Sequence, residues 1–208
     1  MSKERLFKCL KKGRVGPNAG FQWPKPRTWV KAEGPLSVCE NGIHLCREND
    51  LIHWFNDEIY EAEYRGAERI DSDDKIVVRE ARLTKRLRTW NEKTARLFAC
   101  DCAERALPIF EKKYPDDKRP RQAIETAREY ANGKATKKEL VAAWAAARDA
   151  AGVAAWAAAR YVACDAAWYA ARYAARYAAW DAGRDAARAA ERKWQTERLM
   201  EYLYSEKK

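Results

Sequence analysis

The sequence predicts an α+β fold, in which a small β-rich module of residues 1–84 precedes an alanine-rich helical bundle of residues 85–208. Glycine, proline and asparagine cluster between residues 13 and 35, where they indicate turns between short extended segments. From residue 84 onward, apolar residues recur at helical spacing and helix start and stop signals alternate. The last part of the chain is dominated by alanine, the residue with the highest helix propensity.

Short runs of apolar and β-branched residues, each bounded by turn residues, predict the strands of the N-terminal module. These strands are Leu6–Leu10, Phe21–Trp23, Thr28–Lys31, Ile43–Leu45, Ile59–Tyr64 and Lys75–Arg82. The last two strands, joined through Gly66 and the segment Asp71–Asp74, are expected to form a hairpin or to lie side by side. A short helix is expected over Glu48–Phe55, because its apolar residues gather on one side.

Three helices are predicted after residue 84. Apolar and small residues at helical spacing predict the first over Asn91–Lys113, where a following Tyr-Pro pair ends it. Arg119 and Pro120 open the second helix, which ends at an Asn-Gly pair. The third begins at Thr136, which can form a capping box with Glu139, and it runs into the alanine-rich tract.

Tryptophans recur every twelve residues in this tract, and an arginine follows each of them four positions later. The series is Trp144, Trp156, Trp168 and Trp180, with Arg148, Arg160, Arg172 and Arg184. Because a helix turns by about 100° per residue, each twelve-residue step moves the tryptophan by roughly 120° around a straight helix. The pattern therefore excludes a single amphipathic stripe. We expect several short helices that each bury a tryptophan, or one helix surrounded on most sides, with breaks near Gly152 or Gly183.

The arginine, tryptophan and tyrosine side chains of the tract are the candidate binding residues. Arginine recognises phosphates and carboxylates with two hydrogen bonds, and tryptophan and tyrosine stack on bases and dominate protein interfaces. The predicted recognition surface consists of Trp156, Arg160, Trp168, Arg172, Tyr173, Arg176, Trp180 and Arg184. The alternative is that each arginine pairs with a nearby aspartate, as in Asp181 with Arg184, while the aromatic side chains pack in the core.

The charge of the chain favours an anionic partner. Its formal net charge is +10 and its pI is about 9.3, which suits an acidic protein, an anionic nucleotide or nucleic acid. Alternatively the charges are simply solvated, because 31 acidic residues are interspersed among 41 basic ones. No stretch is long and apolar enough to span a bilayer, and no signal region follows the N-terminus. We therefore expect a cytoplasmic protein with no membrane partner and with mostly reduced cysteines.

The sequence does not favour catalysis, a cofactor or a metal. Cys39, His44, Cys46 and His53 are zinc-ligand types, but they lack the usual Cys-x-x-Cys spacing, so we expect no metal site. A nucleophilic dyad of His44 with Cys39 or Cys46 is conceivable, yet no further motif supports it. Cys100 and Cys102 lie about 200° apart around a helix and are expected in the core.

Three motifs of the helical part resemble the immunity-5-like domain of bacterial immunity proteins. They are the run from Thr94 to Pro108 (TARLFACDCAERALP), the run from Pro115 to Tyr130 (PDDKRPRQAIETAREY) and the run from Glu191 to Leu199 (ERKWQTERL). Together with the alanine-rich tract, the resemblance covers residues 90 to 204. It implies a non-catalytic protein that neutralises a toxin or immune effector by binding, in immunity or in phage counter-defence.

The N-terminal part resembles an uncharacterised domain of phage and bacterial proteins. The resemblance rests on the phrases GFQW from Gly20, VCENGIHLC from Val38 and IYEAEY from Ile59, and it implies no activity. Two other functions stay open for the whole chain. One is a sponge that sequesters an anionic nucleotide signal in a basic aromatic pocket, and the other is nucleic-acid binding.

Overall fold

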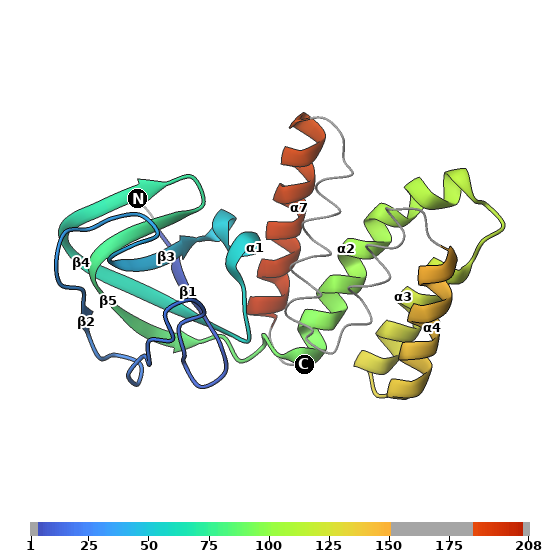
Figure 1. Cartoon of the computed structure of the whole chain (residues 1–208), viewed down its shortest axis with the longest axis horizontal. Coiled ribbons are helices and arrows are strands. Elements are labelled where there is room, and N and C mark those ends of the chain that lie inside the picture. Colours follow the sequence, from blue (N-terminus) through green and yellow to red (C-terminus); the bar gives the residue numbers. More distant parts are fainter. Residues whose placement is uncertain (1–3, 151–184, 206–208) are drawn as a thin grey trace. The chain divides into compact units, whose positions relative to one another are not determined.

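The computed structural model describes residues 4–150 and 185–205, and these residues form two compact units. The first unit ends at Trp90 and the second begins at Asn91. The predicted α+β class is confirmed, because an antiparallel sheet of five strands is followed by helices (Figure 1). The division of the chain into domains at residue 84 stays a prediction. In the structure Leu87 and Trp90 are buried, and the Trp90 indole donates a hydrogen bond to the Asn56 carbonyl at 2.8 Å.

The first unit is a sheet whose strands close on themselves. Its strands are β1 (Leu6–Leu10), β2 (Val30–Lys31), β3 (Ile43–Arg47), β4 (Glu58–Ser72) and β5 (Lys75–Arg86). The strand order is β2-β5-β3-β1-β4, and β4 also pairs with β5 (Figure 1). This additional pairing joins β5, β3, β1 and β4 into a ring with an inner and an outer face.

Most of the predicted strands are confirmed, with two differences. Phe21–Trp23 is not a strand, because Gln22 makes only an isolated bridge to Val15. Gly66 lies inside β4 rather than at the hairpin turn, so β4 and β5 are longer than predicted. The pairing register shifts between Arg65 and Arg69, and Gly66 adopts a φ of 89° there. Glycine adopts a positive φ without steric strain, so β4 continues through this register shift instead of ending at Gly66.

The predicted short helix Glu48–Phe55 forms as a 3₁₀ turn, Glu48–Asp50, followed by α1 (Leu51–Trp54). The buried Asp50 carboxylate accepts hydrogen bonds from the Arg47 backbone at 2.9 Å and from the Arg47 side chain at 2.7 Å. This pairing compensates the buried charge of Asp50, the last residue of the 3₁₀ turn.

The inner face of the ring forms an apolar cluster. Alternate residues of a strand share a face, and Leu6 and Leu10 of β1 both belong to the cluster. Leu45 of β3 and Ile76 of β5 join them, and both side chains are fully buried. Lys8 lies between Leu6 and Leu10 on the strand and therefore projects from the same face. A lysine at a core-facing position is unusual, because lysine is rarely buried without a partner for its charge.

The second unit is helical. It contains α2 (Glu92–Lys113), α3 (Arg119–Ala131), α4 (Lys137–Ala150) and α7 (Asp185–Tyr204). The three helix starts that the sequence predicts are confirmed. The Asn91 side chain caps α2 by accepting from the Thr94 N–H at 3.3 Å. The capping box before α4 is present, since the Glu139 N–H donates to the Thr136 hydroxyl at 3.2 Å and the Thr136 N–H donates to the Glu139 carboxylate at 2.6 Å.

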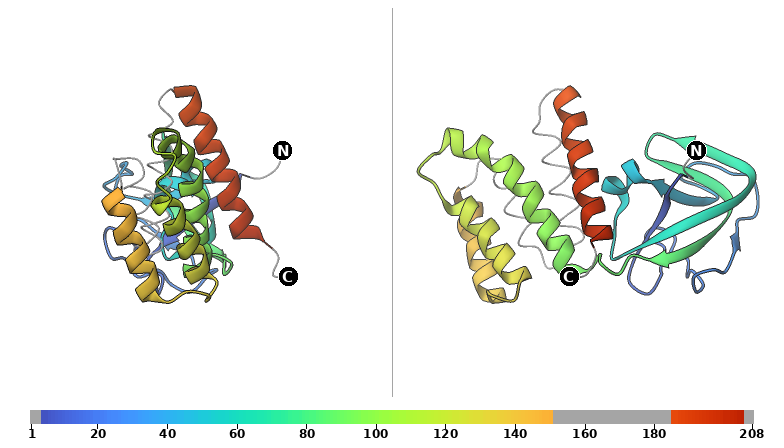
Figure 2. Two further views of the ribbon diagram at one scale, coloured as in Figure 1. Left: turned by 90° about the vertical axis from the view of Figure 1, so that its right-hand side faces the viewer. Right: turned by 180° about the vertical axis from the view of Figure 1, so that it is seen from behind.

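Alanines allow close packing of α3 against α4, which lie side by side in Figures 1 and 2. Ala123 of α3 and Ala147 of α4 are buried against each other, with Trp144 at the edge of their contact. Cys100 and Cys102 are both buried, as predicted. Burial raises the pKa of the Cys100 thiol to about 12, so this cysteine is a packing residue rather than a nucleophile.

Asp101 of α2 connects three helices. Its carboxylate is only 7% exposed, and it accepts hydrogen bonds from Arg128 of α3 at 2.6 Å and from Arg198 of α7 at 2.6 Å. The Tyr202 hydroxyl of α7 donates to it at 2.8 Å. Burial and the nearby Asp101 charge raise the pKa of Tyr202, which keeps this donor protonated. A buried carboxylate with three charged or polar donors is well compensated.

We expect the Asp101→Ala substitution to lower the free energy of unfolding of the helical unit by about 3 kcal/mol, because it leaves two arginines without their shared counterion. Urea unfolding followed by circular dichroism at 222 nm measures this loss. Glu201→Ala is the matched control, since it removes a 63% exposed partner of Arg198 and should cost less than about 1 kcal/mol. Equal losses in the two variants would contradict the importance of Asp101.

We expect Gly42→Ala to destabilise the sheet unit by about 3 kcal/mol. A methyl group at Gly42 would lie 2.5 Å from Val77 Cγ1 and 2.9 Å from Leu36 Cδ2, and the backbone φ is 119°. Gly13→Ala is the control, because Gly13 also has a positive φ but no atom within 4 Å of the added carbon. It should cost about 1 kcal/mol, which reflects the backbone alone. Thermal unfolding of both variants separates the steric contribution from the backbone contribution.

Candidate functional site

The predicted recognition surface lies outside the residues that the structure describes. This applies to Trp156, Arg160, Trp168, Arg172, Tyr173, Arg176, Trp180 and Arg184. The alternative pair of Asp181 with Arg184 lies outside them as well. The surface therefore stays a prediction.

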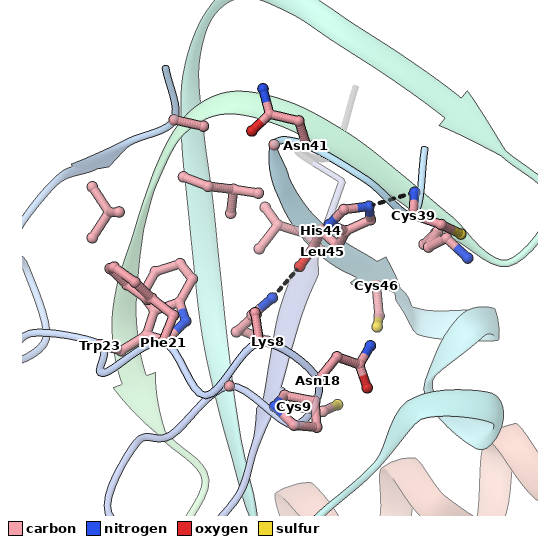
Figure 3. Close-up of a pocket in the computed structure, with 18 of the residues that line it drawn as sticks. Lys8, Cys9, Asn18, Phe21, Trp23, Cys39, Asn41, His44, Leu45 and Cys46 are labelled. Atoms are coloured by element: carbon pink, nitrogen blue, oxygen red, sulfur yellow. Dashed lines mark hydrogen bonds between the residues drawn. The ribbon is translucent and has the colours of Figure 1, made fainter. Parts of the chain in front are cut away.

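A cavity of about 370 Å³ opens in the sheet unit (Figure 3). Its walls come from β1 and β3, from the loop before Trp23 and from the turn around Asn41. Segments that are distant in the sequence thus converge on it: residues 8–9, 16–23, 30–32 and 39–46, together with Trp54 and Lys75. Nothing in the local sequence of any one segment signals the cavity, except the lysine within the apolar run of β1.

Lys8 is one of the charged residues that line this cavity, together with Lys31, Glu40 and Lys75. Its Nζ donates a hydrogen bond to the His44 carbonyl oxygen at 2.7 Å and lies 5.4 Å from the ring centroid of Trp23 (Figure 3). Burial lowers the pKa of the Lys8 ammonium below its usual value of 10.5, although the thiols of Cys46 and Cys9 act in the opposite direction. The Lys8 amine therefore lies where water solvates its charged form less well than at the surface.

Trp23 and Phe21 form an aromatic wall of the cavity. Their rings are 5.9 Å apart at an angle of 88°, an edge-to-face arrangement. Trp23 is 4% exposed, whereas Phe21 is 49% exposed and is one of the large apolar side chains at the surface. The wall thus runs from the buried interior to solvent.

His44 adopts a neutral form in this cavity. Its Nε2 accepts a hydrogen bond from the backbone N–H of Cys39 at 3.0 Å (Figure 3). Burial lowers the pKa of His44, and the charges of Lys8 and Lys75 lower it further. The contact with Cys39 is made by its backbone rather than its thiol, so it does not form the nucleophile–base pair that the sequence left conceivable.

The zinc reading is not supported by the described residues. None of their histidine, cysteine, aspartate and glutamate side chains form a group of three that could hold a metal ion. Cys46 is buried, and its pKa is raised by a hydrogen bond with Cys9 and by burial. A thiol in this state is a poor metal ligand and a poor nucleophile.

The described surface of the helical unit carries both signs of charge. Its arginines pair with carboxylates: Arg105 with Glu191, Arg119 with Asp117, Arg121 with Glu111, Arg128 with Glu104 and Arg198 with Glu201. Arg105 also lies 4.3 Å above the Trp194 ring, in a hollow that Asp101 and Glu104 border. Paired arginines are less available to phosphates than unpaired ones.

Comparisons with known proteins agree with the sequence motifs. A family model described as "Imm-5 like putative immunity protein" matches residues 85–202. A second model, for a domain of unknown function (DUF7666), matches residues 5–95. No curated protein and no solved structure matches the chain. Among the described helices, none has the length and apolar character needed to cross a membrane.

We expect the stability of the sheet unit to fall as the pH drops through 6.5 toward the lower pKa of folded His44. In that range the unfolded histidine binds a proton that the folded one does not, so protonation favours unfolding. The measurement is the urea midpoint at pH 7.5 and at pH 5.5 for the wild-type chain and for His44→Gln. The wild-type chain should lose more stability than the variant. An equal or smaller loss would contradict the neutral state of folded His44.

Proposed function

Because the chain belongs to the family of Imm-5 like immunity proteins, we propose that it neutralises a toxin or immune effector by binding it in the cytoplasm. The family shows an immunity-type function, and immunity proteins are generally non-catalytic. The observation that carries the proposal is the match over residues 85–202, which is more than half of the chain. The matched range includes the whole alanine-rich tract with its tryptophans, arginines and tyrosines.

The predicted recognition surface supplies the side chains that such binding needs. Tryptophan, tyrosine and arginine are the residue types that most often dominate the binding energy of protein interfaces. The eight residues of this surface are all of these types. The net charge of +10 favours an acidic face on the target, which would be masked or plugged by the basic, aromatic tract.

Two other functions use the same residues. Arginines and aromatic rings would also suit an anionic nucleotide, so the chain could act as a sponge for a nucleotide immune signal in phage counter-defence. The regular spacing of arginine in the tract would also suit the phosphates of nucleic acid. The mixed charge of the described helical surface favours a protein target over both.

The binding proposal predicts that the chain restores growth to cells that express a toxic product of a neighbouring gene. Arg172→Ala with Arg176→Ala should weaken the complex by at least about tenfold, which corresponds to about 1.4 kcal/mol. The readouts are colony formation on co-expression and isothermal titration with the purified toxic product. Arg121→Ala is the matched control, because Arg121 already pairs with Glu111 and lies outside the predicted surface. Undiminished rescue and affinity in the double variant would contradict the assigned surface.

The nucleotide alternative predicts a different result in a thermal-shift screen of cyclic nucleotides and ADP-ribose derivatives. A true ligand at 100 times its dissociation constant adds about 2.7 kcal/mol to stability. A protein-binding inhibitor should show no such shift. Binding to generic DNA or RNA that weakens steeply with added salt would instead favour the nucleic-acid function.

A further inference from the structure

We propose that the cavity of the sheet unit binds a small molecule that carries a flat aromatic ring and one anionic group. This inference goes beyond the immunity function, which rests on the helical part of the chain. It stands on the position of one ammonium group, on the aromatic wall beside it and on the size of the cavity.

The Lys8 ammonium uses one of its N–H donors in the hydrogen bonds that the described residues make. Lys8 projects from the inner face of β1, between Leu6 and Leu10, and its Nζ donates to the His44 carbonyl at 2.7 Å. An ammonium has three N–H donors, and among the described residues this carbonyl is the acceptor it reaches. Burying a charge is costly unless it is paired, so an anion in the cavity would supply the missing partner.

Lys75 provides the contrast within the same cavity. Its Nζ lies 3.1 Å from the Asp74 carboxylate and 4.7 Å from the Trp54 ring centroid, so its charge is already neutralised. Lys8 has no carboxylate within ion-pair distance among the residues that the structure describes. The anionic group of a ligand is therefore assigned to Lys8 and not to Lys75.

The aromatic wall defines the rest of the ligand. Trp23 is nearly buried beside Lys8, and Phe21 extends this apolar wall to the surface with half of its area exposed. Figure 3 shows both rings on one side of the Lys8 side chain. A flat ring packed on this wall could place its anionic substituent at Nζ. Ring packing is worth about 0.5–1.5 kcal/mol beyond the area that it buries.

The volume limits the size of the occupant. Small-molecule sites span about 300–1,000 Å³, and a cavity of about 370 Å³ lies at the lower end of this range. It accommodates one ring system with one charged group rather than a peptide or a nucleic-acid strand. Aromatic carboxylates and nucleoside monophosphates share this chemistry.

The test uses the full chain and two fluorescent probes. 1-Anilinonaphthalene-8-sulfonate is aromatic and anionic, whereas N-phenyl-1-naphthylamine has the same rings without the charge. We expect Lys8→Gln to weaken binding of the sulfonate by at least about tenfold and to leave the neutral probe within about twofold. Phe21→Ala should weaken both probes. Lys11→Gln, which removes an exposed lysine outside the cavity, should change neither.

Competition then distinguishes the two sources of the ligand. Displacement of the sulfonate by adenosine monophosphate but not by indole-3-acetate indicates a nucleotide, and the reverse indicates an aromatic carboxylate. Unchanged sulfonate affinity in a folded Lys8→Gln variant would overturn the proposal, and so would the absence of displacement by either competitor. If Lys8→Gln does not fold, the wild-type Trp23 indole N–H signal in NMR decides, because sulfonate binding in the cavity must shift it.

Discussion

The shared carboxylate of Asp101 is the interaction on which the packing of the helical unit depends. Its partners come from α3 and from α7, and Tyr202 is 101 residues away along the chain. Because a shift of either helix would remove hydrogen-bond donors from a buried carboxylate, this side chain favours one arrangement of the three helices. α4 packs on α3 and ends at Ala150, while α7 begins at Asp185. The network therefore holds α7 directly and α4 through α3, and these two helices flank the residues between Ala150 and Asp185.

Two buried charged side chains, Asp101 in the helical unit and Lys8 in the sheet unit, differ in how far they are paired. In the helical unit, the Asp101 carboxylate is fully supplied with donors and serves packing. In the sheet unit, the Lys8 ammonium shares a cavity with aromatic rings and reaches one carbonyl. The first arrangement stabilises the packing of the helices, and the second leaves hydrogen-bond donors of Lys8 without a protein acceptor among the described residues. The proposed functions follow this difference, with a protein target for the helical part and a small anion for the sheet part.

Much of the fold could be predicted from the sequence, because its signals are local. The boundaries of β1 follow from a short apolar run bounded by turn residues, and the starts of the three helices after residue 84 follow from helix caps and proline. Phe21–Trp23 was wrongly predicted as a strand. These apolar residues line the cavity, and Gln22 between them makes only an isolated bridge to Val15. The cavity itself could not be predicted. Its lysine, its aromatic rings and its histidine come from separate segments that only the closure of the sheet brings together.

By itself the sequence determined the α+β class, the caps and ends of the helices, the family of the helical part and the residue types available for recognition. These properties depend on neighbours within a few residues or on composition, which the chain carries before it folds. Tertiary structure decided which charges are paired, that His44 is neutral and that Lys8 faces a cavity. Those properties depend on desolvation and on partners up to a hundred residues away, and both arise only when distant strands and helices pack.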